Sequence, residues 1–301
     1  MKLHRQVIEE LRVDPGEPAA LGRRSTNETS TNWLGSTGKS HPRELAEHDL
    51  EGFRGDLTST QELLYASDRY AVLIILQALD AAGKDGTIKH VMSGVNPQGC
   101  TVVSFKQPST EELGHDFLWR CSKALPERGR IGIFNRSYYE DVLVTRVHPD
   151  LLVDQHLRSQ ARHGKKLWVQ RYEDINTFEH HLHRSGTRIL KLFLHVSKDE
   201  QKRRFLRRLD DPAKQWKFSS ADLAERSHFD KYQRAYEDAI TATSTRWAPW
   251  YVVPADHKYA ARALVGCILV QAVEQLDLQL PEITVEGHAA LDAARRILLG
   301  E

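Results

Sequence analysis

A lysine and two carboxylates lie in and beside a glycine-containing turn at residues 80–86 (DAAGKDG). In a phosphate-binding loop, backbone N–H groups and a helix N-terminus hold phosphate oxygens, and a lysine neutralises the outer charges. The pattern GxxxxGK[ST] is met only in part, because Ala78 replaces its first glycine and Asp85 replaces the hydroxyl residue that usually binds Mg²⁺. The residues predicted to bind phosphate are Ala81, Ala82, Gly83, Lys84, Asp85 and Gly86.

Asp80 and Asp85 are the candidate metal ligands of this turn. An anion site that carries carboxylates fits a divalent cation held between the acids and the phosphates, which predicts Mg²⁺, with Mn²⁺ as the alternative ion. The competing interpretation is an ordinary strand-to-helix turn. A second sequence, residues 35–40 (GSTGKS), ends in the more usual Gly-Lys-Ser, but no apolar strand precedes it, and we reject it as a nucleotide site.

A second polar cluster follows the apolar segment 131–134. Arg136 could grip a phosphate with its fork of N–H donors, and Glu140 and Asp141 could hold a metal or a nucleotide group. The alternative for the two acids is a helix start with carboxylates in its first turn.

A third cluster, between Lys198 and Arg226, is rich in basic residues. Its arginines at 203, 204, 207 and 208 have helical spacing, which predicts that they cover one side of a helix. Such a run fits either a solvated charged helix or a basic lid over a polyanion.

Histidines and cysteines give no metal site. His180, His181 and His183 are not separated by four residues, as two zinc ligands on one helix face would be, so we interpret them as a polar helix surface. The cysteines, Cys100, Cys121 and Cys267, form no CxxC pair and are expected to be reduced thiols of a cytoplasmic protein.

The elements that must position these clusters alternate along the chain. Strands are predicted at 70–76, 101–105, 130–134, 188–196 and 250–253, and helices at 61–70, 86–93, 110–125 and 259–276. This alternation indicates an α/β fold in which a parallel sheet is covered on both faces. Residues 12–46 show neither period, and we expect a surface-running or partly mobile arm.

Composition narrows the function classes. The chain has 301 residues, 40% of them apolar, and a net charge of +1. A balanced charge argues against binding to nucleic acid or a membrane surface by overall attraction. The longest aliphatic run, 71–76, is too short for a bilayer span, and no secretory signal is expected at the N-terminus.

Several stretches, taken in order, resemble the polyphosphate kinase 2 family, in particular its class III members. They are 76–100 (LQALDAAGKDGTIKHVMSGVNPQGC), 134–144 (FNRSYYEDVLV), 192–199 (LFLHVSKD), 210–219 (DDPAKQWKFS), 229–236 (FDKYQRAY) and 243–255 (TSTRWAPWYVVPA). The resemblance covers about residues 55–280 as a catalytic domain, and leaves 1–54 as an N-terminal arm and 281–301 as a tail without motifs.

The resemblance implies a P-loop kinase-like three-layer α/β/α sandwich with a helical lid over about 199–245. It implies Mg²⁺-dependent phosphoryl transfer from inorganic polyphosphate to AMP and ADP, with ATP as product and guanine nucleotides as further acceptors, in a homo-dimer or homo-tetramer. The catalytic residues it implies are Asp80, Lys84, Arg136 and Glu140. Those for polyphosphate, beyond the loop, are Arg203, Arg204, Arg208, Lys214 and Lys217. Those for the nucleotide or lid are Asn135, Tyr139, Asp141, Asp222 and Arg226.

Two alternatives stay open at this stage. One is an ATP-dependent nucleoside monophosphate kinase of the same fold, since such kinases often have Asp-Arg where this chain has Asn135-Arg136. The other is a non-catalytic nucleotide switch, which would want a guanine-reading NKxD motif that the sequence lacks. No histidine is placed to carry a covalent phosphoryl group, which favours direct in-line transfer.

Overall fold

The computed structural model describes residues 2–27, 41–153, 155 and 164–300. The segment 35–40, with its Gly-Lys-Ser ending, lies outside these residues. Within the described residues, six strands form one sheet in the order β1-β6-β5-β2-β4-β3, and all neighbours are parallel except β1 and β6. The strands are β1 (Arg12–Val13), β2 (Ala71–Ala78), β3 (Cys100–Ser104), β4 (Ile131–Asn135), β5 (Thr187–His195) and β6 (Trp250–Pro254).

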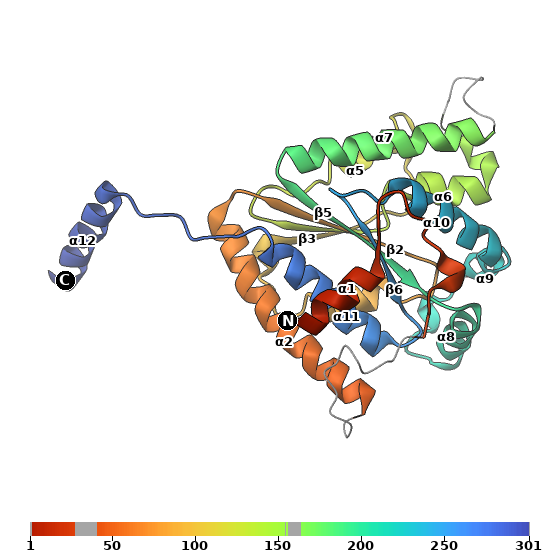
Figure 1. The fold of residues 1–301 in the computed structure, drawn as a ribbon, viewed down its shortest axis with the longest axis horizontal. Coiled ribbons are helices and arrows are strands. Elements are labelled where there is room, and N and C mark those ends of the chain that lie inside the picture. The colour runs from red at the N-terminus through yellow and green to blue at the C-terminus, as the bar shows by residue number, and fades with distance from the viewer. Residues whose placement is uncertain (1, 28–40, 154, 156–163, 301) are drawn as a thin grey trace.

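Helices cover both faces of this sheet (Figure 1). They are α1 (Lys2–Leu11), α2 (Pro42–Ser67), α3 (Lys84–Val91), α4 (Thr110–Leu113), α5 (Trp119–Ser122), α6 (Glu140–Val147), α7 (Lys165–Arg184), α8 (Lys198–Asp210), α9 (Ser220–Arg226), α10 (Phe229–Thr243), α11 (Lys258–Glu274) and α12 (Val285–Gly300).

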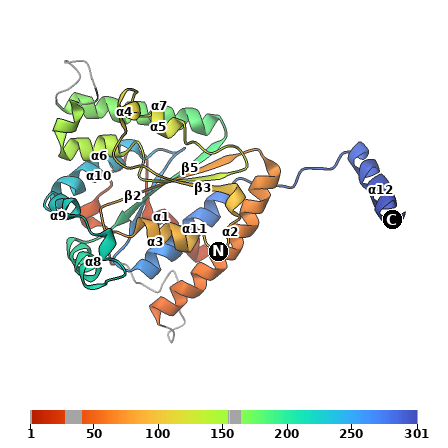
Figure 2. The ribbon, with the colours of Figure 1, turned by 180° about the vertical axis from the view of Figure 1, so that it is seen from behind.

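The helices α1, α2, α3 and α11 pack together on one face of the sheet, and α6, α7 and α10 pack on the other (Figures 1 and 2). The prediction of a three-layer α/β/α sandwich is therefore confirmed, with the short β1 as the one antiparallel strand. None of the helices in the described part of the chain is long and apolar enough to cross a membrane.

β2 is the centre of the sheet, between β5 and β4. All eight of its residues are buried, as expected for a parallel strand covered on both faces. The register pairs Leu76 with Asn135 and Ala78 with Leu194, so the loops after β2, β4 and β5 leave the sheet at the same edge. In open α/β folds ligands bind at this carboxyl edge, and α8 and α9 lie beside it (Figure 1).

The helix predicted over 110–125 is wrong in extent, because the structure has two short helices, α4 and α5, in its place. Ser109 caps α4 in a capping box with Glu112. Gly114 then ends α4, and the Asp116 carboxylate accepts a hydrogen bond from the backbone N–H of Leu118. A glycine and a local side-chain acceptor both compete with helix continuation.

The described parts of the N-terminal segment, 12–27 and 41–46, also differ from the surface-running arm that we expected. β1 pairs with β6, and Ala19 and Leu21 are buried against the body. The Glu237 carboxylate accepts hydrogen bonds from the backbone N–H groups of Ala20 and Leu21, both at 2.7 Å. α2 begins at Pro42 and continues across residue 54 without a break. At the other end of the chain, α12 stands away from the body (Figures 1 and 2).

Candidate active site

The turn between β2 and α3 has the backbone of an anion-binding loop. Ala81 and Gly83 both have left-handed conformations, with φ of 62° and 108°, and Gly83 directly precedes α3. A side chain at Gly83 would be strained in this conformation, which explains a glycine there. The turn thus leads into a helix N-terminus, where the first N–H groups have no partner within the helix and the helix dipole attracts an anion, although the N–H of Ala82 donates to the backbone oxygen of Leu79 within the turn.

Lys84 is the first residue of α3 and is buried. Its Nζ donates a hydrogen bond of 2.7 Å to the backbone oxygen of Ala78, so the side chain folds back along the turn. Burial, and then the nearby Arg136, lower the pKa of the Lys84 ammonium, while the neighbouring carboxylates raise it. The lysine is held in place before any ligand arrives.

Arg204 supports the same turn from α8. Its guanidinium donates hydrogen bonds to the backbone oxygens of Ala81, Ala82, Ala255 and Asp256 and to the Glu200 carboxylate. Only 3% of its side chain is exposed. Arg204 therefore fastens the phosphate loop to the segment after β6, although its edge also lines the cavity described below.

Arg136 lies between two carboxylates at the end of β4. It bonds to Asp80 at 2.7 Å and to Glu140 at 3.2 Å. Burial alone would lower the pKa of its guanidinium, but Glu140 and Asp80 raise it above the usual value. Its φ of 65° is left-handed, which is rare for a residue with a side chain and is often found at functional sites.

A large basic cavity opens over the loop, with a volume of about 730 Å³. Asp80, Asp85 and Asp222 line it, together with a larger number of basic side chains. The basic lining residues are Lys84, Lys106, Arg136, Arg204, Arg207, Arg208, Lys214, Lys258 and Arg262. A concave surface with this surplus of positive charge attracts a polyanion.

Four of these basic residues were not among the site residues expected from the sequence. They are Lys106, Arg207, Lys258 and Arg262. Lys258 and Arg262 stand four apart at the start of α11, directly after the last strand, and that position at the carboxyl edge was the signal available. Burial and three neighbouring arginines lower the pKa of Lys258 to about 8.

A smaller pocket lies on the other side of Arg136, with a volume of about 40 Å³. It shares Asp80, Arg136 and Asp222 with the large cavity, so these residues stand between two adjacent spaces. Its other polar lining includes Glu140 and Arg226. Its aromatic lining consists of Phe229, Tyr232 and Tyr236.

The structure brings most of the expected site residues into these two spaces, but not all of them. Tyr139 is fully buried, and its hydroxyl donates a hydrogen bond to the Glu179 carboxylate. Asp141 is also buried, and its carboxylate accepts a hydrogen bond from the side chain of Gln155. Burial raises the pKa of Asp141 to about 6. Arg203 points to solvent with 66% of its side chain exposed. The side chain of Lys217 lies outside the part that the structure describes, although its backbone forms a 3₁₀ turn.

The α8 arginines lie on one side of the helix, as expected, because Arg203, Arg204 and Arg207 all bond to the Glu200 carboxylate, but they differ in burial. Arg204 and Arg208, four residues apart, are mostly covered, and Arg208 pairs with Asp222 of α9 at 3.0 Å. Arg203 and Arg207 are mostly exposed. The sequence spacing predicted how these side chains are separated around the helix axis. Only the packing of α8 against the rest of the protein decides which of them are covered.

Oxygen atoms suited to a hard cation lie at the rim of the loop. Asp80 and Asp85 line the large cavity, and the amide nitrogen of Asn135 donates to Asp85 at 2.8 Å. The amide oxygen of Asn135 is buried and has no hydrogen-bond partner among the described residues. Mg²⁺ commonly uses one or two carboxylates plus phosphate oxygens, so this donor set fits it. Within the described ranges, no group of three or more His, Cys, Asp or Glu side chains could hold a metal.

Comparison with known proteins adds independent evidence. The family model for polyphosphate kinase 2 matches residues 41–281. An ADP-polyphosphate phosphotransferase of Rhodopseudomonas palustris is 50% identical over 290 residues, 96% of this chain and 98% of the relative. An AMP/ADP-polyphosphate phosphotransferase of Meiothermus ruber is 50% identical over 226 residues, 75% of this chain and 80% of the relative.

The fold is also similar to that of a solved structure. The crystal structure of polyphosphate kinase 2 from Arthrobacter aurescens superposes with a TM-score of 0.82 at 39% sequence identity. The match covers 95% of this chain and 96% of that one.

Proposed function

The chain belongs to the polyphosphate kinase 2 family, and we propose that it transfers phosphoryl groups from inorganic polyphosphate to AMP and ADP. The observation that carries the proposal is that the large basic cavity and the smaller pocket lie next to each other and share Asp80, Arg136 and Asp222 as lining residues. A long polyanion needs an extended basic surface, and a transfer reaction needs a donor and an acceptor that meet at one point.

In this proposal the donor chain lies in the large cavity. The loop N–H groups and Lys84 hold the phosphoryl group that is transferred, and Arg208, Lys214, Lys258 and Arg262 neutralise the following phosphates. Arg136 contacts a phosphate of the acceptor from the other side. Catalysis then rests on positioning and on fixed positive charge where negative charge develops, as in other phosphoryl transfers.

Polyphosphate kinases of this family generally depend on a metal ion. We assign Mg²⁺ to this site, with Asp80 and Asp85 as the residues that hold it, and Mn²⁺ as the alternative. The bound ion would supply charge neutralisation at the phosphates. Asn135 orients the Asp85 carboxylate by its hydrogen bond, and the Arg136 guanidinium orients Asp80.

The acceptor lies in the smaller pocket, beside Glu140, Asp222 and Arg226. At about 40 Å³ this pocket is smaller than the roughly 300 Å³ or more that small-molecule sites usually have. We therefore propose that α9 moves outward when a nucleotide enters, which agrees with a lid in this part of the chain. α9 has no buried residue, so its displacement exposes little apolar surface.

The relatives differ in the acceptor that their names give, ADP in one case and AMP or ADP in the other. We propose both AMP and ADP as acceptors for this chain, because it has Glu140 at the position where class III members have an acidic residue. Guanine nucleotides as acceptors, a homo-dimer or homo-tetramer, and a cytoplasmic location remain predictions from the sequence.

The decisive experiment is an ATP-free assay. Purified protein is incubated with Mg²⁺, long-chain polyphosphate and, separately, AMP, ADP, GMP or GDP, and the nucleotides are separated by chromatography. Formation of ADP from AMP, and of ATP from ADP, is expected. No product with polyphosphate, but ADP formed from AMP and ATP, would favour the nucleoside monophosphate kinase, and nucleotide binding without turnover in either mixture would favour the switch.

The same assay tests the site. Lys84→Ala and Asp80→Asn should each reduce the rate by about 10²-fold or more, because each removes an electrostatic group at the reacting phosphates. Lys89→Ala, an exposed lysine later in α3, is the matched control and should leave the rate unchanged. A folded Lys84→Ala protein with near-normal turnover would refute the assignment.

A further inference from the structure

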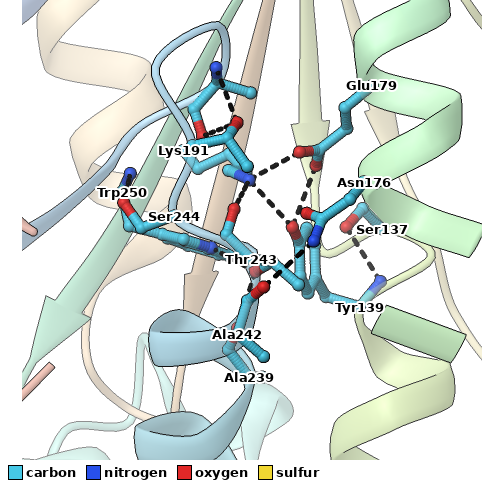
Figure 3. Close-up of polar contacts among 12 residues, drawn as sticks. Ser137, Tyr139, Asn176, Glu179, Lys191, Ala239, Ala242, Thr243, Ser244 and Trp250 are labelled. Carbon is cyan, nitrogen blue, oxygen red and sulfur yellow. Dashed lines mark hydrogen bonds and ion pairs between the residues drawn. The ribbon is translucent and has the colours of Figure 1, made fainter. Parts of the chain in front are cut away.

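A buried ion pair lies in the interior beneath the segment that carries Arg136 and Glu140. Lys191 of β5 and Glu179 of α7 are both 0% exposed, and the Nζ–Oε2 distance is 2.6 Å (Figure 3). The residues around Lys191 in β5, from Ile189 to Leu194, are otherwise apolar and buried. Burying ionised side chains costs desolvation free energy, so an ion pair at this depth points to a role beyond stabilising the fold.

Every donor of the Lys191 ammonium is used. Besides the Glu179 bond, Nζ donates to the hydroxyl oxygen of Tyr139 at 3.0 Å and to the backbone oxygen of Thr243 at 2.6 Å. An ammonium has three donors and no acceptor, so these three bonds satisfy it. The ring of Trp250 packs edge-on against that of Tyr139, with centroids 4.8 Å apart.

Glu179 fixes two tyrosines at once. Its Oε1 accepts hydrogen bonds of 2.9 Å from the hydroxyls of Tyr138 and Tyr139. Burial raises the pKa of both hydroxyls well above the usual value, so they stay protonated and act as donors. Both tyrosine rings are therefore tied to β5 and α7, which belong to the rigid core of the fold.

Tyr138 and Tyr139 occupy the short stretch between Arg136 and Glu140. On the other side, the backbone N–H of Arg136 donates to the backbone oxygen of Leu76 in β2. The left-handed φ of Arg136 costs energy and persists only when the surroundings hold the chain on both sides. The two tyrosine anchors provide that hold after Arg136.

We propose that Lys191 and Glu179 are positioning residues for the acceptor side of the active site, acting through the hydroxyls of Tyr138 and Tyr139 to set the positions of Arg136 and Glu140. The inference rests on the proposed function, since it assigns the acceptor phosphate to Arg136. The phosphate loop on the donor side is held differently, by hydrogen bonds of Lys84 to Ala78 and of Arg204 to Ala81 and Ala82, and none of these bonds involves the tyrosines. The two sides are linked at Arg136, which bonds to Asp80 and lines both spaces.

This separation of the two sides distinguishes positioning from simple stabilisation. If the cluster only stabilised the fold, its loss would lower the melting temperature and affect both substrates alike. If it positions the acceptor side, its loss lowers kcat and raises the KM for AMP far more than the KM for polyphosphate. The split between the two KM values is therefore the informative readout.

The test uses Tyr138→Phe/Tyr139→Phe, which keeps both rings and removes both hydroxyl tethers, and Glu179→Gln, which removes the shared charge. Ile189→Ala, in the same strand as Lys191, is the control for a loss of stability alone, because its aliphatic side chain makes no polar contact with the tyrosines. Melting temperature, kcat and the KM for each substrate are measured for all proteins. Tyr139→Phe alone is the fallback if the other variants do not fold.

We expect the KM for AMP to rise about tenfold in the tyrosine and glutamate variants, with the KM for polyphosphate within twofold of wild type. The Ile189→Ala control should keep both KM values. An unchanged KM for AMP in folded Tyr139→Phe and Glu179→Gln proteins overturns the inference, as does an equal rise for both substrates.

The proposed function fails separately from this inference. Wild-type protein that makes no ADP from polyphosphate refutes the proposed reaction, and calorimetric titration with AMP alone then tests the positioning role. Tenfold weaker AMP binding in the variants would support that role even then, while equal binding, or no binding to the wild type, would reject it.

Discussion

Replacing Arg204 by lysine separates two roles that this arginine could have. The sequence places it among the ligands of polyphosphate, whereas the structure shows its guanidinium bonded to backbone oxygens of the phosphate loop and of the segment after β6. Arg204→Lys keeps the charge but replaces a planar fork of five donors by a point charge with three. A ligand role tolerates that change better than a supporting role does.

The loss of stability expected for Arg204→Lys can be estimated from the hydrogen bonds of the Arg204 guanidinium. Arg204 makes hydrogen bonds to four backbone oxygens and one carboxylate. Lysine can make at most three of these, so at least two are lost, and a hydrogen bond to a charged group contributes about 1.5–3 kcal/mol. The loss of about 3 kcal/mol at the lower end predicts a fall in Tm of roughly 5–10 °C. A displacement of the loop by about 1 Å would lower turnover by about 10²-fold.

The assay is thermal melting followed by ATP-free phosphorylation of AMP at varied polyphosphate and salt concentrations. Arg203→Lys is the matched control, because Arg203 is the preceding residue and 66% of its side chain is exposed. It should change stability by no more than about 0.5 kcal/mol. A supporting role predicts that Arg204→Lys lowers kcat at saturating polyphosphate.

An Arg204→Lys protein that has the same Tm as the Arg203→Lys control and keeps its kcat would rule out the supporting role of Arg204. A rise in the KM for polyphosphate alone, stronger at high salt, would return Arg204 to the role of a ligand. Salt weakens contacts between exposed charges and a polyanion far more than it weakens buried hydrogen bonds.

Two further predictions concern pH. In the free enzyme, kcat/KM for polyphosphate should fall as pH rises through about 8, because Lys258 then loses its positive charge in the basic cavity. Lys258→Met should lower kcat/KM at pH 7 and flatten this part of the pH profile. An unchanged pH profile in Lys258→Met would contradict the assignment of this titration to Lys258. The carboxyl of Asp141 binds a proton more readily in the folded state, so stability should fall as pH rises from about 4 to about 6. The rise of its pKa from 3.8 to about 6 corresponds to about 3 kcal/mol. Asp141→Asn should therefore raise Tm at pH 7 and weaken the pH dependence in this window, as measured by calorimetry; an unchanged or lower Tm would argue against a buried, destabilised carboxylate.

The local patterns of the sequence predicted structure correctly where a strand or turn depends mainly on residues that are close together in the chain. The apolar run of β2, the glycine before Lys84 and the polar cluster after β4 each describe a strand end or a turn that depends on neighbouring residues. The alternation of such strands with helices was sufficient to predict a parallel sheet covered on both faces, and the family resemblance implied the α/β/α sandwich. The failed helix over 110–125 shows the limit of this reasoning, since Gly114 interrupts it.

The sequence by itself determined the alternation of strands and helices from about residue 70 onward, the phosphate loop and the motifs shared with the family. Only the tertiary structure decided that Arg204 supports the loop, that Lys258 and Arg262 join the cavity, and that Lys191 meets Glu179 beneath the tyrosines. Helical or strand spacing fixes the directions of side chains relative to one another within an element. The packing of the elements decides which side chains face the core and which distant residues they contact there. That packing is set by contacts between residues far apart in the chain.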